Sequence, residues 1–182
     1  MREVDFHEDD YCQIEVLPLA NWQFCSQEMQ AINAFAEQHR AAIGWTKMYP
    51  RSENPHPLSE LRIGRQELTD CLREVLPEFD RVTTGYGCQI DVCPRTTAFG
   101  HDRAVVFFAE FGHAETMAAM WLRLDVFTRD LAASALQAFR ALSEKWQLLL
   151  ADWGWSVLLE LADSEHLSSY LQQRIEVFSG EK

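Results

Sequence analysis

Four residues in the middle of the chain, Cys88, Cys93, His101 and His113, have side chains of the kind that bind zinc. Structural zinc sites usually pair ligands about two to five residues apart. Here four residues separate the two cysteines and eleven separate the two histidines. The histidines also end two Phe-Gly-His triplets on either side of an apolar segment, and an extended segment of that length holds the imidazoles roughly 30 Å apart. This spacing predicts no metal site, and no cofactor is expected.

Nucleophilic catalysis is the next chemistry to consider, because the chain has five cysteines and six histidines. A cysteine or serine is activated when a neighbouring base accepts its proton. The sequence contains no Gly-x-Ser-x-Gly, His-Glu-x-x-His or Gly-x-Gly-x-x-Gly motif. Cys88 falls on an inward position of a predicted strand and is interpreted as a small buried apolar residue. No catalytic residue is assigned, and a small cytosolic hydrolase with a Cys/His cluster in the central strands stays open as an alternative.

An acidic run near the start of the chain is the first candidate for binding a partner. Glu8, Asp9 and Asp10 are adjacent and precede a predicted strand. Such a run is often a solvated chain end. Fixed at the end of a strand, it forms a dense negative patch that attracts a basic partner and speeds encounter.

A long surface loop at about residues 44–64 is the second candidate. It contains three prolines and has no hydrophobic period. Structureless connections longer than about 12 to 15 residues are uncommon in compact domains and are usually functional or disordered. Trp45, Tyr49 and Arg51 lie in this loop, and these residue types dominate binding hot spots. The alternative is that Trp45 and Tyr49 only pack the loop onto the domain.

Composition restricts the classes of partner. The 182 residues include 28 Asp or Glu against 16 Lys or Arg, which gives a formal net charge of −12. A negatively charged protein repels the negatively charged phosphate backbone, so nucleic acid is not expected as a ligand. The longest central apolar run is six residues, far short of the ~20 that cross a bilayer, so no membrane partner is expected. Scattered cysteines in odd number and an acidic start without an export signal indicate a cytoplasmic protein.

Hydrophobic periodicity predicts the elements that position these residues. Strands are expected at residues 10–19, near a sheet edge, and at 86–92, 103–111, 116–125 and 156–161. Helices are expected at 26–43, with Ser26 as N-cap, at 66–76, at 130–153 and after the N-cap Asp163. The strands within 86–125 have connections too short for parallel crossovers, so they form an antiparallel meander. We expect one α+β domain over residues 1–182, with this sheet packed against amphipathic helices.

The order of these segments resembles a known family. The opening Glu8-Asp9-Asp10-Tyr11 before a strand, the helix that closes with Gly44-Trp45, the long loop, and the apolar meander followed by helices are similar to the small α+β immunity proteins of bacterial polymorphic toxin systems. The most similar are the TsiT-like proteins that partner nuclease toxins delivered by type VI secretion. The resemblance implies a cytosolic protein that binds and neutralises a cognate toxin without catalysis of its own.

The charge of the chain suits such a role, because a nuclease presents a basic cleft that an acidic protein can cover. Neutralising a toxin needs a dissociation constant of about nanomolar, which corresponds to a binding free energy of about 12 kcal/mol. Charge alone does not supply this energy, so buried aromatic and arginine side chains must contribute as well. We therefore predict that the partner is bound by the acidic residues Glu8, Asp9 and Asp10 together with Trp45, Tyr49 and Arg51. A binding surface on the sheet face or helix ends, and a non-catalytic adaptor function, remain as alternatives, and the oligomeric state is left open.

Overall fold

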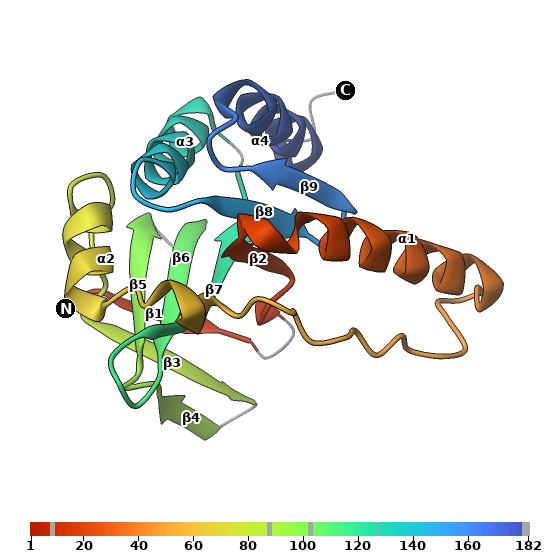
Figure 1. The fold of residues 1–182 in the computed structure, drawn as a ribbon, viewed down its shortest axis with the longest axis horizontal. Helices are drawn as coiled ribbons and strands as arrows, with labels where there is room; N and C mark the ends of the chain where they lie inside the picture. Colours follow the sequence, from red (N-terminus) through yellow and green to blue (C-terminus); the bar gives the residue numbers. More distant parts are fainter. Residues whose placement is uncertain (8–9, 87–88, 102–103, 127, 180–182) are drawn as a thin grey trace.

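The computed structural model describes residues 1–7, 10–86, 89–101, 104–126 and 128–179. It combines a six-stranded antiparallel sheet, a three-stranded sheet and four α-helices, so the expected α+β class is confirmed (Figure 1). The large sheet has the order β5-β6-β7-β2-β8-β9. Its strands are β2 (Ile14–Pro18), β5 (Thr96–His101), β6 (Val105–Phe111), β7 (Met117–Leu124), β8 (Leu148–Asp152) and β9 (Val157–Glu160). In the small sheet β1 (Glu3–Phe6) runs parallel to β3 (Arg81–Tyr86), and β4 (Gln89–Val92) pairs antiparallel with β3.

The central antiparallel meander is confirmed, but one of its strands was misplaced by the sequence analysis. β5, β6 and β7 form the meander, and β6 lies in its middle with nearly every residue buried, as predicted. Residues 89–92 of the expected strand at 86–92 form β4, but β4 pairs with β3 in the small sheet and is not part of the meander. The segment Thr96–His101, expected to be a connection, supplies the missing strand.

Three helices cover one face of the large sheet and complete the main core. They are α2 (Arg65–Arg73), α3 (Arg129–Ser143) and α4 (Ser164–Ser179), which contribute Leu68, Phe139 and Leu171 to it. α2 begins one residue before the predicted helix at 66–76 and ends three residues before its predicted end. α4 begins after Asp163 as predicted, and the Asp163 carboxylate accepts a hydrogen bond from the backbone N–H of His166 at 3.1 Å.

The predicted helix at 130–153 ends ten residues early, at Ser143. The apolar run Leu148–Asp152 that follows is β8, which pairs with β2 and β9. Short apolar runs fit a buried strand as well as a helix, and here both faces of the strand are covered. The expected strand at 156–161 is confirmed as β9.

The other face of the large sheet is covered in two parts. The small sheet packs over the meander, where Val4 and Val82 contact a cluster that includes Phe108 and Trp121. α1 (Trp22–Gln38) packs over β2 and β8 through Cys25 and Met29. The seam between β2 and β7 lies between these two covers.

The position of β2 differs from the expectation. It was expected near an edge, but it lies between β7 and β8 and all five of its residues are buried. The strand ends at Pro18. Because both faces are covered, Glu15 is buried and requires partners within the protein.

α1 begins and ends earlier than the predicted 26–43. It starts at Trp22, directly after a 3-10 turn at Leu19–Asn21, so Ser26 lies within the helix and is not its N-cap. Beyond Gln38 the chain turns back through an isolated bridge between Arg40 and Trp45, with Gly44 in the left-handed region at φ +70°. None of the helices in the described ranges combines the length and the apolar character that a membrane span requires.

Candidate functional site

The most prominent feature outside the core is an arm, which we define as residues 30–57. Figure 1 shows α1 extending past the large sheet and the chain returning beneath it. The buried residues of α1 are Cys25, Glu28 and Met29, so the rest of the helix projects from the body. The return segment has no helix or strand before the 3-10 turn at Leu58–Leu61, in agreement with the predicted loop.

Buried polar side chains hold the base of this return segment. Asn21 exchanges two hydrogen bonds with the backbone of His56, at 2.7 Å to its carbonyl oxygen and 3.1 Å from its N–H. Glu28 accepts a hydrogen bond from the backbone N–H of Ser52 at 2.8 Å. Desolvation, and then the Glu28 carboxylate, raise the pKa of Tyr49. These contacts fix residues 49–56 against the start of α1.

The tip of the arm, in contrast, exposes large apolar side chains. Ile43 and Met48 are more than 90% exposed, and Trp45 is 67% exposed. Tyr49 is partly buried against Phe35 of α1, with the ring centroids 5.3 Å apart. Large exposed apolar side chains gathered on one segment mark an interaction surface more often than scattered ones do.

A groove of about 470 Å³ lies between α1, the tip and the end of β8. Its lining is mainly apolar and includes Ile32, Phe35, Trp45, Met48, Tyr49 and Trp153. Two of the predicted binding residues, Trp45 and Tyr49, therefore lie in one groove. Pockets of about this size accommodate small ligands or the anchoring side chains of a protein.

Arg51, the third predicted residue of the loop, lies outside the groove and has partners within the chain. Its Nη1 donates to Oε2 of Glu15 at 2.6 Å, and its guanidinium lies 4.2 Å from the centroid of the Trp153 ring. Trp153 also donates from Nε1 to the same Glu15 oxygen at 2.6 Å. The predicted site residues did not include Glu15 or Trp153, and the available signal for Glu15 was an acidic residue between the apolar residues Ile14 and Val16.

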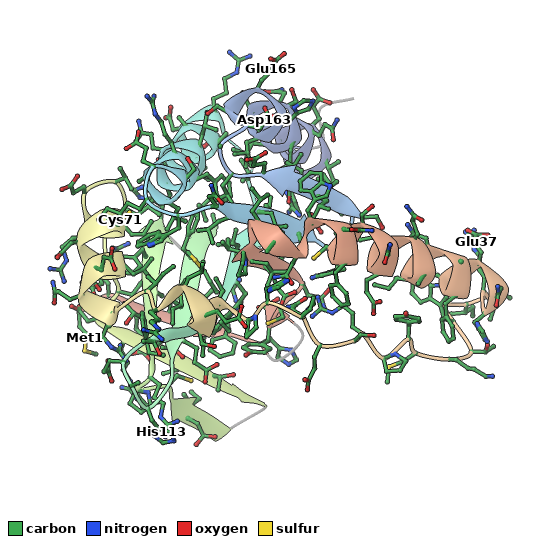
Figure 2. All side chains as sticks on the ribbon, viewed as in Figure 1. Met1, Glu37, Cys71, His113, Asp163 and Glu165 are labelled. Atoms are coloured by element: carbon green, nitrogen blue, oxygen red, sulfur yellow. The ribbon has the colours of Figure 1, made fainter. Side chains whose placement is uncertain are left out.

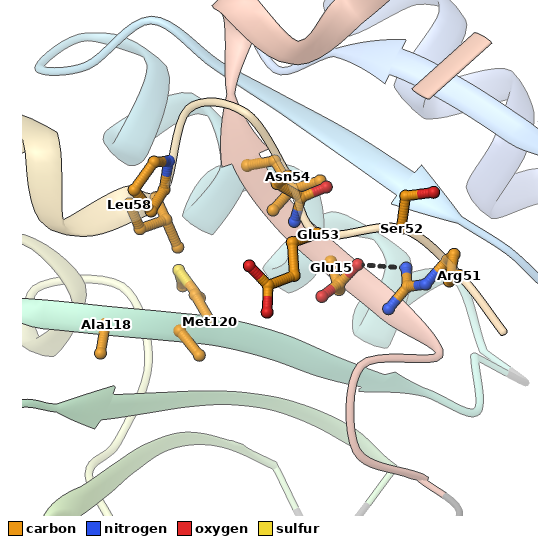
Figure 3. Close-up of a pocket in the computed structure, with 11 residues that line it drawn as sticks. Glu15, Arg51, Ser52, Glu53, Asn54, Leu58, Ala118 and Met120 are labelled. Carbon is orange, nitrogen blue, oxygen red and sulfur yellow. Dashed lines mark hydrogen bonds and ion pairs between the residues drawn. The ribbon is translucent and has the colours of Figure 1, made fainter. Parts of the chain in front are cut away.

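A cavity of about 460 Å³ lies on the other side of this contact, over the seam between β2 and β7 (Figure 3). Its floor includes Ala118, Ala119 and Met120, and its walls include Glu15, Arg51, Glu53 and Leu58. Trp153 lines the groove and Arg51 lines the cavity, so their stacked side chains separate the two.

Asp10, the described member of the acidic run, is not gathered with the loop residues. Asp10 lies in the connection between β1 and β2, where its carboxylate accepts from Arg123 Nη2 at 2.7 Å and from the His7 N–H at 3.1 Å. It lines neither the groove nor the cavity. Glu8 and Asp9 lie outside the described residues, so their part in binding stays a prediction.

The described cysteines are thiols rather than activated nucleophiles. Burial, and next the Glu15 carboxylate, raise the pKa of Cys25 to about 11. The pKa values of Cys12, Cys71 and Cys93 are also raised, mainly by burial. A raised pKa lowers the thiolate fraction and with it the reactivity. Cys88, the cysteine considered for a Cys/His cluster, lies outside the described residues.

Within the described part of the chain, no three His, Cys, Asp or Glu side chains are placed to hold a metal ion. Comparisons of the sequence with protein-family models and with curated proteins, and of the fold with solved structures, find no match. The groove and the cavity beside the arm are therefore the features that bear on function.

Proposed function

We propose that this chain is a cytoplasmic immunity protein that binds and blocks a cognate secreted toxin, which the charge argument identifies as a nuclease. The observation that carries the proposal is the exposed apolar tip, with Ile43, Trp45 and Met48 beside a groove of about 470 Å³. Burying these side chains against a partner stabilises the complex by about 25 cal/mol for each Å² of apolar surface removed from water.

The way the arm is built supports a binding role. Asn21 and Glu28 hold the base of the return segment, so the tip is presented on a scaffold that is already formed. Ordering a loop before binding lowers the entropy lost on association. The net charge of −12 adds long-range attraction to a basic partner, which increases the association rate at low salt.

The proposal expects a secreted toxin to be encoded by a neighbouring gene, and co-expression with that toxin is the test. The wild-type chain should restore growth and bind the purified toxin with about nanomolar affinity. The double variant Trp45→Ala/Met48→Ala should weaken binding by at least about 30-fold, mainly through faster dissociation, because both are placed as hot-spot residues.

Val177→Ala is the matched control, since Val177 is an exposed apolar residue on α4 (62% exposed) away from the arm. It should bind and protect like the wild type. Failure of the wild-type chain to bind or protect would contradict the immunity function. Wild-type affinity of the double variant would instead remove the groove from the interface.

A further inference from the structure

The cavity over the β2–β7 seam has an apolar floor and charged walls. Ala118 is exposed there, Met120 and Leu58 line the cavity with only 1% and 2% of their surface exposed, and the small side chain of Ala118 leaves room above the sheet. Figure 3 shows the Glu53 carboxylate directed into this space, on the side of Met120. β7 pairs with β2 at one register position, Glu15 with Trp121, and the cavity lies beside the earlier part of β7, where Leu58 of the 3-10 turn also lines it.

The charges of the cavity do not balance. Glu15 and Arg51 neutralise one another through an ion pair of 2.6 Å. Glu53 also lines the cavity and is exposed, and no ion pair or hydrogen bond joins it to another described residue. The three charged side chains together leave one unbalanced negative charge beside an apolar floor.

We infer that this cavity receives an arginine or lysine side chain of the bound protein, with its cationic group at Glu53. The inference rests on the proposed function and names the chemistry of one anchor of the partner. Long basic side chains bury their methylene groups on apolar surface while the charged end stays near a polar group. The floor of Ala118, Met120 and Leu58 suits the methylene stem, and Glu53 suits the charge.

The groove and the cavity then bind different kinds of side chain. The groove on the Trp153 side takes apolar side chains, and the cavity on the Arg51 side takes a basic one. Since the stacked Arg51 and Trp153 side chains separate them, a partner that fills both needs an apolar and a basic residue at a fixed spacing. Such a pairing provides specificity as well as affinity.

A small probe tests the cavity without the toxin. Amide cross-peaks of the full chain are followed by NMR during titration with N-acetyl-arginine methylamide, with the lysine analogue in parallel, and with the neutral citrulline analogue as the comparison. A cationic probe should shift the Ser52, Asn54 and Met120 amides with a millimolar dissociation constant, and citrulline should bind at least about fivefold more weakly. The arginine and lysine arms show which basic group is preferred.

Glu53→Gln should weaken binding of the cationic probe by about fivefold. Glu37→Gln is the matched control, because it removes the same charge from the same arm but lies at its far end (Figure 2). It should bind the probe like the wild type.

Equal shifts with citrulline, or equal effects of the two variants, would overturn the inference. So would an absence of shifts up to ~50 mM probe, where a 1 mM site is nearly saturated. Those results would leave the toxin-binding test of the groove unaffected, so the two proposals can fail separately.

Discussion

The guanidinium of Arg51 is stacked on the ring of Trp153, 4.2 Å from its centroid, and both side chains donate to one oxygen of Glu15. Arg51 belongs to the arm, Trp153 directly follows β8, and Glu15 is the second residue of β2. A single buried carboxylate thus connects the arm to the central strands of the large sheet. The same contact separates the apolar groove from the charged cavity, so it sets the shape of both.

Glu15→Ala should destabilise the protein by about 2 kcal/mol, because it leaves the Trp153 N–H without its acceptor and Arg51 without its counter-ion. Urea unfolding measures the change. Hydrogen exchange should also become faster at the Ser52 amide, since the return segment loses one of its attachments. Glu37→Ala, at the exposed end of the arm, should stay within about 0.5 kcal/mol of the wild type. A similar small change for Glu15→Ala would show that the carboxylate does not hold the arm.

The sequence was informative where the local pattern and the tertiary environment agree. β6, the amphipathic α2 and the Asp163 cap of α4 were predicted because an apolar run, a helical period and a capping residue act over a few positions. The pattern also predicted the strand that is β2, but it placed that strand near an edge of the sheet instead of in the middle. Pairing with β8 joins Glu15 to Ala151, more than a hundred residues away, and no local pattern contains that partner.

The candidate site was predicted in part for the same reason. The composition of the loop pointed to Trp45 and Tyr49, which do share a groove. Arg51 has the residue type of a binding anchor, but its partners Glu15 and Trp153 lie far from it in the sequence. Whether an arginine faces solvent or a buried carboxylate depends on which strands are central, and that follows from the complete fold.

Arg174→Met should destabilise the protein by about 3 to 5 kcal/mol, since it removes one member of a buried ion pair. Arg174 Nη2 donates to Asp152 Oδ2 at 2.5 Å, and the two side chains are only 6% and 2% exposed. Arg174 also donates to the Leu124 carbonyl oxygen at 2.7 Å. Chemical denaturation provides the measurement. Arg140→Met is the control, because the Arg140 side chain is 74% exposed and its pair with Glu144 should contribute less than about 1 kcal/mol. Equal losses for the two variants would contradict the buried-pair argument.

Cys25 should react slowly with iodoacetamide while the protein is folded. Its pKa is raised to about 11, so at pH 8 only about one thiol in a thousand is ionised, and burial further limits access. Peptide mapping by mass spectrometry should show labelling of Cys25 mainly after urea is added. The Glu15 carboxylate also raises this pKa, so Glu15→Gln should increase the labelling rate of the folded protein. Rapid labelling of the folded wild type would contradict this account.

His166 and Asp163 give the start of α4 a pH dependence. A hydrogen bond to Asp163 raises the pKa of His166 above 6.5, and hydrogen bonds from His166 lower the pKa of Asp163 below 3.8. The contribution of His166 to the free energy of unfolding is therefore complete below pH 6.5 and is lost as the pH rises through the pKa of His166 in the folded protein. The contribution of Asp163 is complete above pH 3.8 and is lost as the pH falls through the pKa of Asp163 in the folded protein. The pair stabilises the helix most between these limits.

Asp163→Asn separates the charge from the cap, because asparagine still accepts the backbone hydrogen bond of an N-cap. The pKa of His166, followed by NMR through its ring carbon-bound protons, should fall toward 6.5 in this variant. Glu165→Gln should lower it much less, since Glu165 is a smaller cause of the shift. If the two variants moved the His166 titration equally, the general acidity of the helix start, rather than the Asp163 contact, would set the pKa.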